Sequence, residues 1–191
     1  NIADAEGDSA LAGTYRDEAE KLYLRALNSG DARKELQFAW LNLGMMYFDA
    51  RKYNEAIPFF DKFIEAFGPD PQVRMGYYYK GFSLYSLGRF QSAADSFEKA
   101  AAIQVDMDIL NKLVNCYEKL GDTEKKILAF EKALEIDPLS FNALYNLGLI
   151  YWERGVIEKG GNYFRQALNV DPDNHLADAI REYLGESGPR R

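Results

Sequence analysis

The chain has very little of the chemistry that metal and disulfide sites require. Its 191 residues include one cysteine, Cys116, and one histidine, His175. A single cysteine excludes an internal disulfide framework and any zinc site built from several thiolates, and a single histidine excludes a ligand set built from imidazoles. The sequence therefore predicts no bound metal. No phosphate-binding loop or dinucleotide fingerprint points to an organic cofactor either.

An excess of positive charge is also absent. Lysine and arginine number 23 against 30 aspartate and glutamate residues, which gives a formal net charge of -7. An acidic field repels a phosphate backbone, and the basic residues that cluster, such as Arg33 with Lys34, are too few to follow a nucleic acid strand. No nucleic acid partner is expected.

Long apolar runs are missing as well. No stretch approaches the roughly 18 to 20 uninterrupted apolar residues that cross a bilayer, so direct membrane insertion is not expected. The chain begins at Asn1 without a charged region followed by an apolar stretch, so a targeting segment is expected to be absent or already removed. The compartment stays open, with the cytoplasm slightly favoured over the periplasm.

The chain does contain an internal repeat of about 34 residues. Large apolar residues, a glycine, a tyrosine, a second glycine, an aromatic residue, an alanine and a proline recur in one order. In the last repeat they are Leu144, Leu147, Gly148, Tyr151, Gly155, Phe164, Ala167 and Pro172. The repeat before it has Leu110, Leu113, Tyr117, Gly121, Phe130, Ala133 and Pro138. The two earlier repeats have Tyr77, Gly81, Leu84, Gly88, Ala93, Phe97 and Ala100, and Trp40, Leu43, Gly44, Tyr47, Ala56 and Phe60.

This spacing predicts a pair of helices in each repeat. Leu144, Leu147 and Tyr151 stand at i, i+3 and i+7, which is one face of a helix. The second glycine follows where the chain must reverse, and the proline after Asp137 or Asp171 ends the second helix. Gly44, Gly81 and Gly148 on first helices are expected to face Ala56 and Ala93 on second helices, so that the two backbones approach closely.

With these residues the chain resembles the tetratricopeptide repeat (TPR) family. The resemblance implies an all-α, right-handed solenoid of about four helix hairpins, at 37–70, 74–106, 107–140 and 141–174. Around them we expect a flexible segment at 1–13, an orphan helix or half repeat at 14–36, a capping helix at 175–186 and a tail at 187–191. The half repeat has two explanations, excision from a longer protein or a native helix that caps the first repeat.

The third repeat departs from the pattern at two positions. It has Val114 where glycine is usual and Lys126 where alanine is usual. Either its helices cross at a wider distance, or the stem of Lys126 extends outward to place its charge in water. We expect this repeat to be the loosest of the four.

The resemblance implies a partner site on the concave surface, which the first helices of such repeats line. An apolar groove with a polar middle is predicted there from Leu41, Met45, Phe48, Tyr78, Phe82, Tyr85, Asn111, Asn115, Tyr145, Leu149 and Trp152. Packing between neighbouring helices explains the outer aromatic residues of this set equally well. The co-chaperone branch of the family holds a carboxylate with lysine and asparagine on first helices, and the corresponding positions here do not supply that set.

The expected function is that of an adaptor that binds an apolar or amphipathic peptide or helix of another protein, within an assembly, secretion or signalling complex. The alternative is a structural or self-associating scaffold within a longer chain. No constellation of nucleophile, base or paired carboxylates supports catalysis, so the chain is not expected to be an enzyme.

Overall fold

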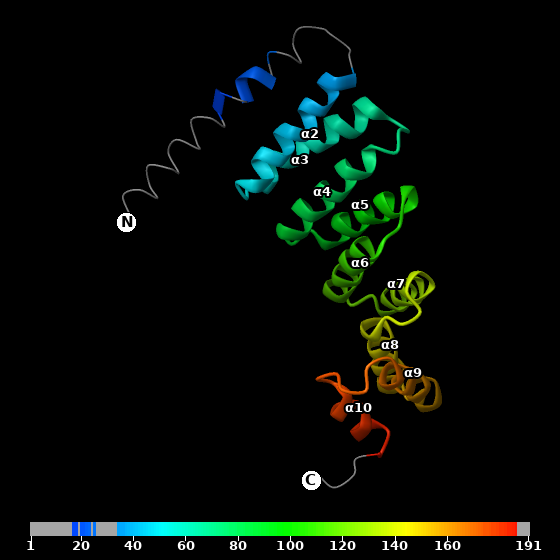
Figure 1. Ribbon diagram of the computed structural model, residues 1–191. Coiled ribbons are helices and arrows are strands. Elements are labelled where there is room, and N and C mark those ends of the chain that lie inside the picture. The colour runs from blue at the N-terminus through cyan, green and yellow to red at the C-terminus, as the bar shows by residue number, and fades with distance from the viewer. Residues whose placement is uncertain (1–16, 19, 24, 26–33, 187–191) are drawn as a thin grey trace, which may run out of the picture. The chain divides into compact units, whose positions relative to one another are not determined.

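The computed structural model describes residues 17–18, 20–23, 25 and 34–186, and these contain helices and no strand (Figure 1). The all-α class expected from the sequence is confirmed for this part of the chain. The segment at 1–13 and the tail at 187–191 lie outside the described residues, as does most of the predicted half repeat.

Four successive helix hairpins form the described region. They are α2 (Lys34–Asp49) with α3 (Tyr53–Phe67), α4 (Val73–Ser86) with α5 (Phe90–Ile103), α6 (Met107–Leu120) with α7 (Thr123–Ile136), and α8 (Phe141–Glu153) with α9 (Ile157–Val170). The shorter α10 (Ala177–Tyr183) follows. Helix α2 begins at Lys34, ahead of the repeat boundary expected at 37. Helices α7 and α9 end before Asp137 and Asp171, which agrees with the prolines that follow these residues.

The chain forms two compact units, which we call the N-terminal unit (residues 1–104) and the C-terminal unit (residues 105–191). The core of the N-terminal unit contains Phe60, Phe63 and Phe67 of α3. The core of the C-terminal unit includes Leu144, Phe164 and Ile180, and Ile180 belongs to α10. The last helix therefore covers apolar surface of the hairpin before it.

The turns inside the hairpins follow from glycine at the point of reversal. Gly88, Gly121 and Gly155 have φ angles of 74°, 68° and 77°, the left-handed region that a residue without a Cβ adopts at little cost. The first hairpin has Arg51 at this point with a φ of 57°. The turn of the first hairpin thus keeps the left-handed conformation, although this conformation is strained for an arginine.

The close approach of paired helices involves an aromatic ring as well as small residues. A Cβ built on Gly44 would lie 2.5 Å from the ring of Phe60, and one on Gly148 would lie 2.5 Å from the ring of Phe164. The first-helix glycine therefore leaves room for a buried aromatic ring of the second helix. At Gly160, the alanine position of the last hairpin, a Cβ would lie 2.9 Å from the backbone oxygen of Gly148, so the small residues of α8 and α9 lie close together.

Aspartate side chains cap the starts of α6 and α7. The side chain of Asp106 accepts a hydrogen bond from the backbone N–H of Ile109 at 2.9 Å, and Asp122 accepts one from Lys125 at 3.0 Å. Each carboxylate satisfies an amide that the first turn leaves unpaired. The caps hold α6 and α7 in the register that places the polar residues described next.

Candidate functional site

The predicted residues of the N-terminal unit divide into one core residue and five half-buried ones. Leu41 is 4% exposed and belongs to the core of the unit, so it offers no side-chain surface to a partner. The other five lie on the first helices α2 and α4, and together we call them the aromatic surface: Met45, Phe48, Tyr78, Phe82 and Tyr85.

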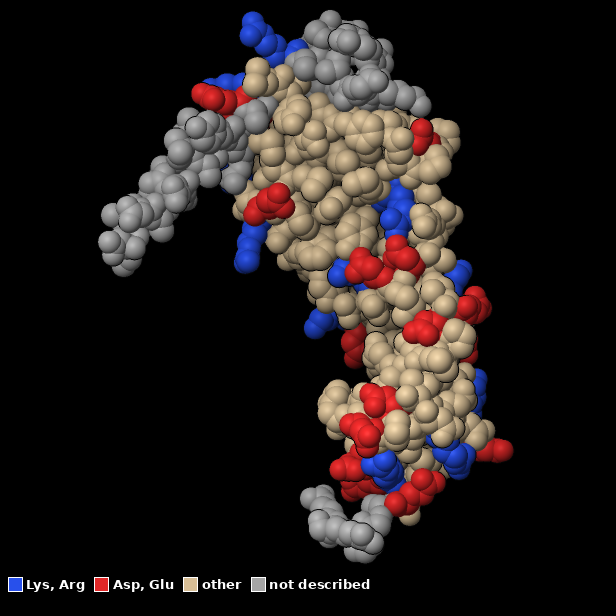
Figure 2. Space-filling model, viewed as in Figure 1, with Lys and Arg blue, Asp and Glu red and all other residues tan. Residues whose placement is uncertain are grey.

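Ring contacts hold the aromatic surface in place. The rings of Phe48 and Phe82 meet edge to face with centroids 5.2 Å apart, and Tyr85 meets Phe90 in the same way at 5.2 Å. In Figure 2 the surface over α2, α3 and α4 carries few acidic or basic side chains. These rings therefore both stabilise the unit and present apolar area on first helices.

The predicted polar residues of the C-terminal unit border a hollow of about 400 Å³. Asn111 and Asn115 are exposed on α6, one turn apart, and the opposite side comes from α8. We call this feature the amide-lined hollow, and its lining consists of Asn111, Val114, Asn115, Glu118, Lys126, Phe130, Asn142 and Asn146.

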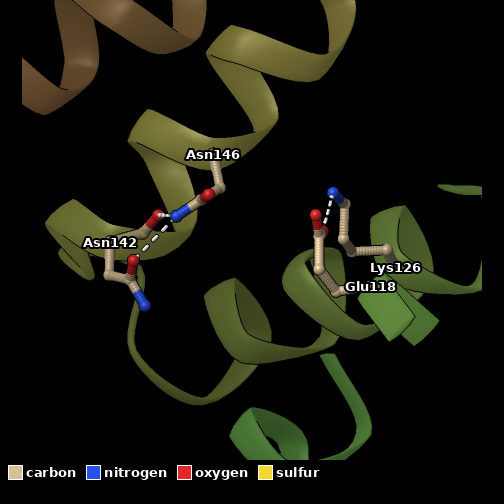
Figure 3. Close-up of polar contacts among 4 residues, drawn as sticks. All are labelled: Glu118, Lys126, Asn142 and Asn146. Carbon is tan, nitrogen blue, oxygen red and sulfur yellow. Dashed lines mark hydrogen bonds and ion pairs between the residues drawn. The ribbon is translucent and has the colours of Figure 1, made fainter. Parts of the chain in front are cut away.

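An ion pair between α6 and α7 lies in the wall of the amide-lined hollow. Lys126 directs its ammonium to the carboxylate oxygen Oε2 of Glu118 (Figure 3). The Lys126 side chain is 19% exposed, while that of Glu118 is 61% exposed. The charge of Lys126 is thus paired with a neighbouring carboxylate, and only a small part of its side chain reaches water.

A second pair of amides completes the hollow on α8. The Nδ2 of Asn146 donates to the backbone oxygen of Asn142 and to its Oδ1, both at 2.7 Å (Figure 3). The predicted set omitted Lys126, Asn142 and Asn146. The spacing of Asn142 and Asn146 at i and i+4, which repeats that of Asn111 and Asn115, was the signal that could have included the second amide pair.

The three predicted residues on α8 pack against their own unit. Trp152 contacts Phe164 with ring centroids 5.9 Å apart and Tyr183 of α10 at 5.7 Å. Tyr145 also contacts the Phe164 ring, and Leu149 packs on the same core. Packing on the core and on α10 therefore accounts for part of the surface of these side chains.

Helical residues before α2 contact its side chains. The hydroxyl of Tyr47 donates to Oε1 of Glu20 at 2.8 Å, and Asn42 donates to the hydroxyl of Tyr23 at 3.3 Å. Loss of the Tyr47 proton would break the first bond and place two negative charges together, so this hydrogen bond, together with burial, raises the pKa of Tyr47 to about 12.

The side chains that most often carry chemistry give no further site in the described residues. Cys116 is fully buried, and burial raises the pKa of its thiol to about 12, which keeps it protonated and unreactive at neutral pH. Within the described residues, no group of three acidic, cysteine or histidine side chains is placed to hold a metal ion. The same part of the chain has no helix with the length and hydrophobicity to cross a membrane.

Family models match the chain along most of its length. A model described as tetratricopeptide repeat matches residues 5–71 and 41–104, which together exceed half of the chain. A second model of the same description matches residues 141–174, and one described as TPR repeat matches residues 115–155.

Three individual proteins illustrate the similarity. A TPR repeat-containing protein of Methanocaldococcus jannaschii is 27% identical over 130 residues, which are 68% of this chain and 22% of that protein. Photosystem I assembly protein Ycf3 of Prochlorococcus marinus is 32% identical over 120 residues, covering 57% of this chain and 66% of that protein. The chain thus spans less than two thirds of either relative. The crystal structure of MamA superposes with a TM-score of 0.63 at 28% identity, covering 87% of this chain and 94% of MamA.

Proposed function

Because the chain belongs to the tetratricopeptide repeat family, whose members mediate protein–protein interactions, we propose that it is a non-enzymatic adaptor that binds segments of partner proteins on its first helices. The observation that carries the proposal is the amide-lined hollow of about 400 Å³, to whose lining the first helices α6 and α8 each contribute two asparagine side chains. Side-chain amides both donate and accept hydrogen bonds, so they match a peptide backbone.

The aromatic surface supports the same role for the N-terminal unit. Met45, Phe48 and Phe82 are half-buried on first helices, and two of them are rigid rings. Rigid aromatic side chains supply contact area with little loss of conformational entropy, which is why they dominate binding surfaces. We propose that this surface takes an apolar or amphipathic segment, and its binding is tested separately from that of the amide-lined hollow.

The relatives favour an assembly role. One of them, Ycf3, is named as a photosystem I assembly protein. The same kind of role in this chain is our proposal, and the partner's identity is a matter for experiment.

A scaffold that associates with itself is the second candidate function. Leu128 on α7 is 63% exposed, and Val156 and Ile157 at the start of α9 are 45% and 47% exposed. Large exposed aliphatic side chains are common on surfaces that another protein covers. Under this candidate the first helices would be dispensable for association.

A photo-crosslinking residue placed at Asn115 tests the adaptor, with the same residue placed at Leu128 as the matched control. We expect adducts with a different protein from Asn115 and not from Leu128. The recovered partner is then purified and its affinity measured for Asn115→Ala, Phe82→Asn and Leu128→Gln, with the melting temperature of each variant. Loss of affinity in Leu128→Gln alone, or adducts with the chain itself from Leu128, would favour the scaffold.

A further inference from the structure

The two side chains of the Glu118–Lys126 pair in the amide-lined hollow differ in their exposure to water. Lys126 is 19% exposed and shares the lining of the hollow with the apolar side chains Val114 and Phe130. Glu118 is 61% exposed, so most of its side chain already lies in water. The ammonium is therefore fixed in the wall, while the carboxylate approaches it from the solvent side.

This asymmetry decides which partner of the pair is easier to displace. An ion pair with a partner as exposed as Glu118 stabilises a protein only slightly, so returning that carboxylate to water costs little. Removing Lys126 from the pair would instead leave an enclosed ammonium without a counter-ion, which is unfavourable. An incoming carboxylate can therefore replace Glu118 more easily than an incoming cation can replace Lys126.

We propose that Lys126 is the binding group for a carboxylate of the partner protein, and that Glu118 occupies its place in the free chain. This inference rests on the proposed function, because it names the kind of segment that the amide-lined hollow takes. The segment is extended and carries an aspartate or glutamate side chain that exchanges with Glu118 on Lys126.

The amides explain why the carboxylate comes from a side chain rather than from a chain end. Asn111 and Asn115 on one helix, and Asn142 and Asn146 on another, each span about 6 Å of helix axis, close to two residues of extended chain. Amides on both sides let a backbone pass through the hollow and continue beyond it. A chain that continues offers its side-chain carboxylates and not a terminal one.

This arrangement differs from the clamp of the co-chaperone branch, whose lysines lie on first helices. Lys126 belongs to the second helix α7, at a position where the pattern calls for a small residue. A further ion pair on α6 links Lys112 to Asp108 at 3.5 Å on its own helix. Lys126 is thus the cation that faces the hollow from α7.

Binding of short peptides to the full chain tests the proposal. The probes have the sequence Gly-Ser-Ala-X-Ala-Ser-Gly with X as Glu, Gln or Lys, acetylated and amidated, together with the Gln peptide carrying a free carboxyl terminus. Affinities are measured by NMR titration, with shifts of asparagine side-chain amides as the local signal. We expect the Glu peptide to bind about twofold to fivefold more tightly than the amidated Gln peptide, the range that one exposed ion pair supplies.

Two variants are expected to change the affinity for the Glu peptide in opposite directions, which separates the proposal from a general electrostatic effect. Glu118→Gln removes the internal competitor and keeps the shape, so it should tighten binding of the Glu peptide about threefold to fivefold and leave the Gln peptide unchanged. Lys126→Met removes the binding group and keeps the length of the stem, so the Glu peptide should lose its advantage. Melting temperatures establish that both variants fold, and Glu118→Gln alone decides the matter if Lys126→Met does not.

The outcomes distinguish this inference from the proposed function on which it rests. The role of Lys126 is overturned if Glu118→Gln binds the Glu peptide more weakly than the parent chain does, or if the Lys peptide binds most tightly of all. If the peptide with a free carboxyl terminus binds as tightly as the Glu peptide, the proposal that the carboxylate comes from a side chain is overturned. If all peptides bind with equal affinity and Asn115→Ala weakens each of them, the inference is overturned and the adaptor function is left intact. If no peptide binds, the result counts against both the inference and the adaptor function.

Discussion

Two adjacent glycines of α9 give opposite expectations for the same substitution. A Cβ at Gly160 would lie 2.8 Å from the backbone nitrogen of Trp152 and 2.9 Å from the backbone oxygen of Gly148. A Cβ at Gly161 would find its nearest neighbour, Cδ2 of Leu184, at 3.5 Å, which is ordinary contact. Backbone atoms cannot rotate away as a side chain can, so Gly160→Ala must push α8 and α9 apart.

The magnitudes follow from two opposing terms. Alanine is favoured over glycine inside a helix by about 1 kcal/mol, and both substitutions gain this amount. Overpacking a close contact costs about 1 to 3 kcal/mol, and contact with backbone places Gly160→Ala toward the upper end. The net change is a loss of about 1 to 2 kcal/mol for Gly160→Ala and a gain of up to about 1 kcal/mol for Gly161→Ala.

Thermal and urea unfolding followed by far-ultraviolet circular dichroism measure the difference. For a chain of this size 1 kcal/mol shifts the melting temperature by about 2 to 4 °C. Gly160→Ala should therefore melt about 2 to 8 °C below the parent, and Gly161→Ala at or slightly above it. A rise in both variants would refute the close approach of α8 and α9, and an equal fall in both would show that the two positions are not distinguished by packing.

Three further expectations concern single side chains. Arg51→Gly relieves the left-handed conformation of the first turn and should raise the free energy of unfolding by about 1 kcal/mol, measured by urea titration; a decrease would mean that the arginine side chain makes a contact worth more than the strain. Cys116 should resist a thiol reagent at mildly alkaline pH until urea unfolds the chain, and rapid labelling of the folded protein would contradict its burial. Glu20→Ala should lower the pKa of Tyr47 from about 12 toward its ordinary value in an ultraviolet phenolate titration; the stability from their hydrogen bond is present below that ordinary value and is lost as the pH rises through about 12.

The fold was predictable because its determinants are local. Helical periodicity lies within one helix, and a reversal such as that at Gly121 needs only a residue that accepts a positive φ. The stops before Pro138 and Pro172 are equally local, since proline acts on the residue before it. The helix ends at Ile136 and Val170 therefore agree with the sequence pattern.

The contacts between helices were less predictable, because they depend on the rotation of each helix about its axis. The pattern predicts a small residue opposite the first-helix glycine, but it does not indicate that the ring of Phe164 also lies against Gly148. Leu41 was assigned to a surface and lies in the core for the same reason. A position on a first helix can face either way by a small rotation that the spacing of apolar residues does not specify.

The candidate site was predicted only in part, because Lys126 stands at a position where the sequence departs from the repeat pattern. Asn111 and Asn115 were identified by their place on a first helix, while Lys126 was recognised only as a residue that does not fit. The length and charge of its side chain are properties of the sequence. The identity of its counter-ion, Glu118, depends on how α6 and α7 lie against each other.

The departure from the pattern and the hollow coincide in the third hairpin. Where the other hairpins place glycine against a buried ring, as at Gly148 and Phe164, the third hairpin has Val114 and Phe130, and both line the amide-lined hollow. Lys126 likewise stands where the other hairpins have alanine or glycine, and it lines the same hollow. The third repeat thus departs from the pattern at residues that border the hollow, which is the relation we expect if the departure serves the partner binding proposed for it.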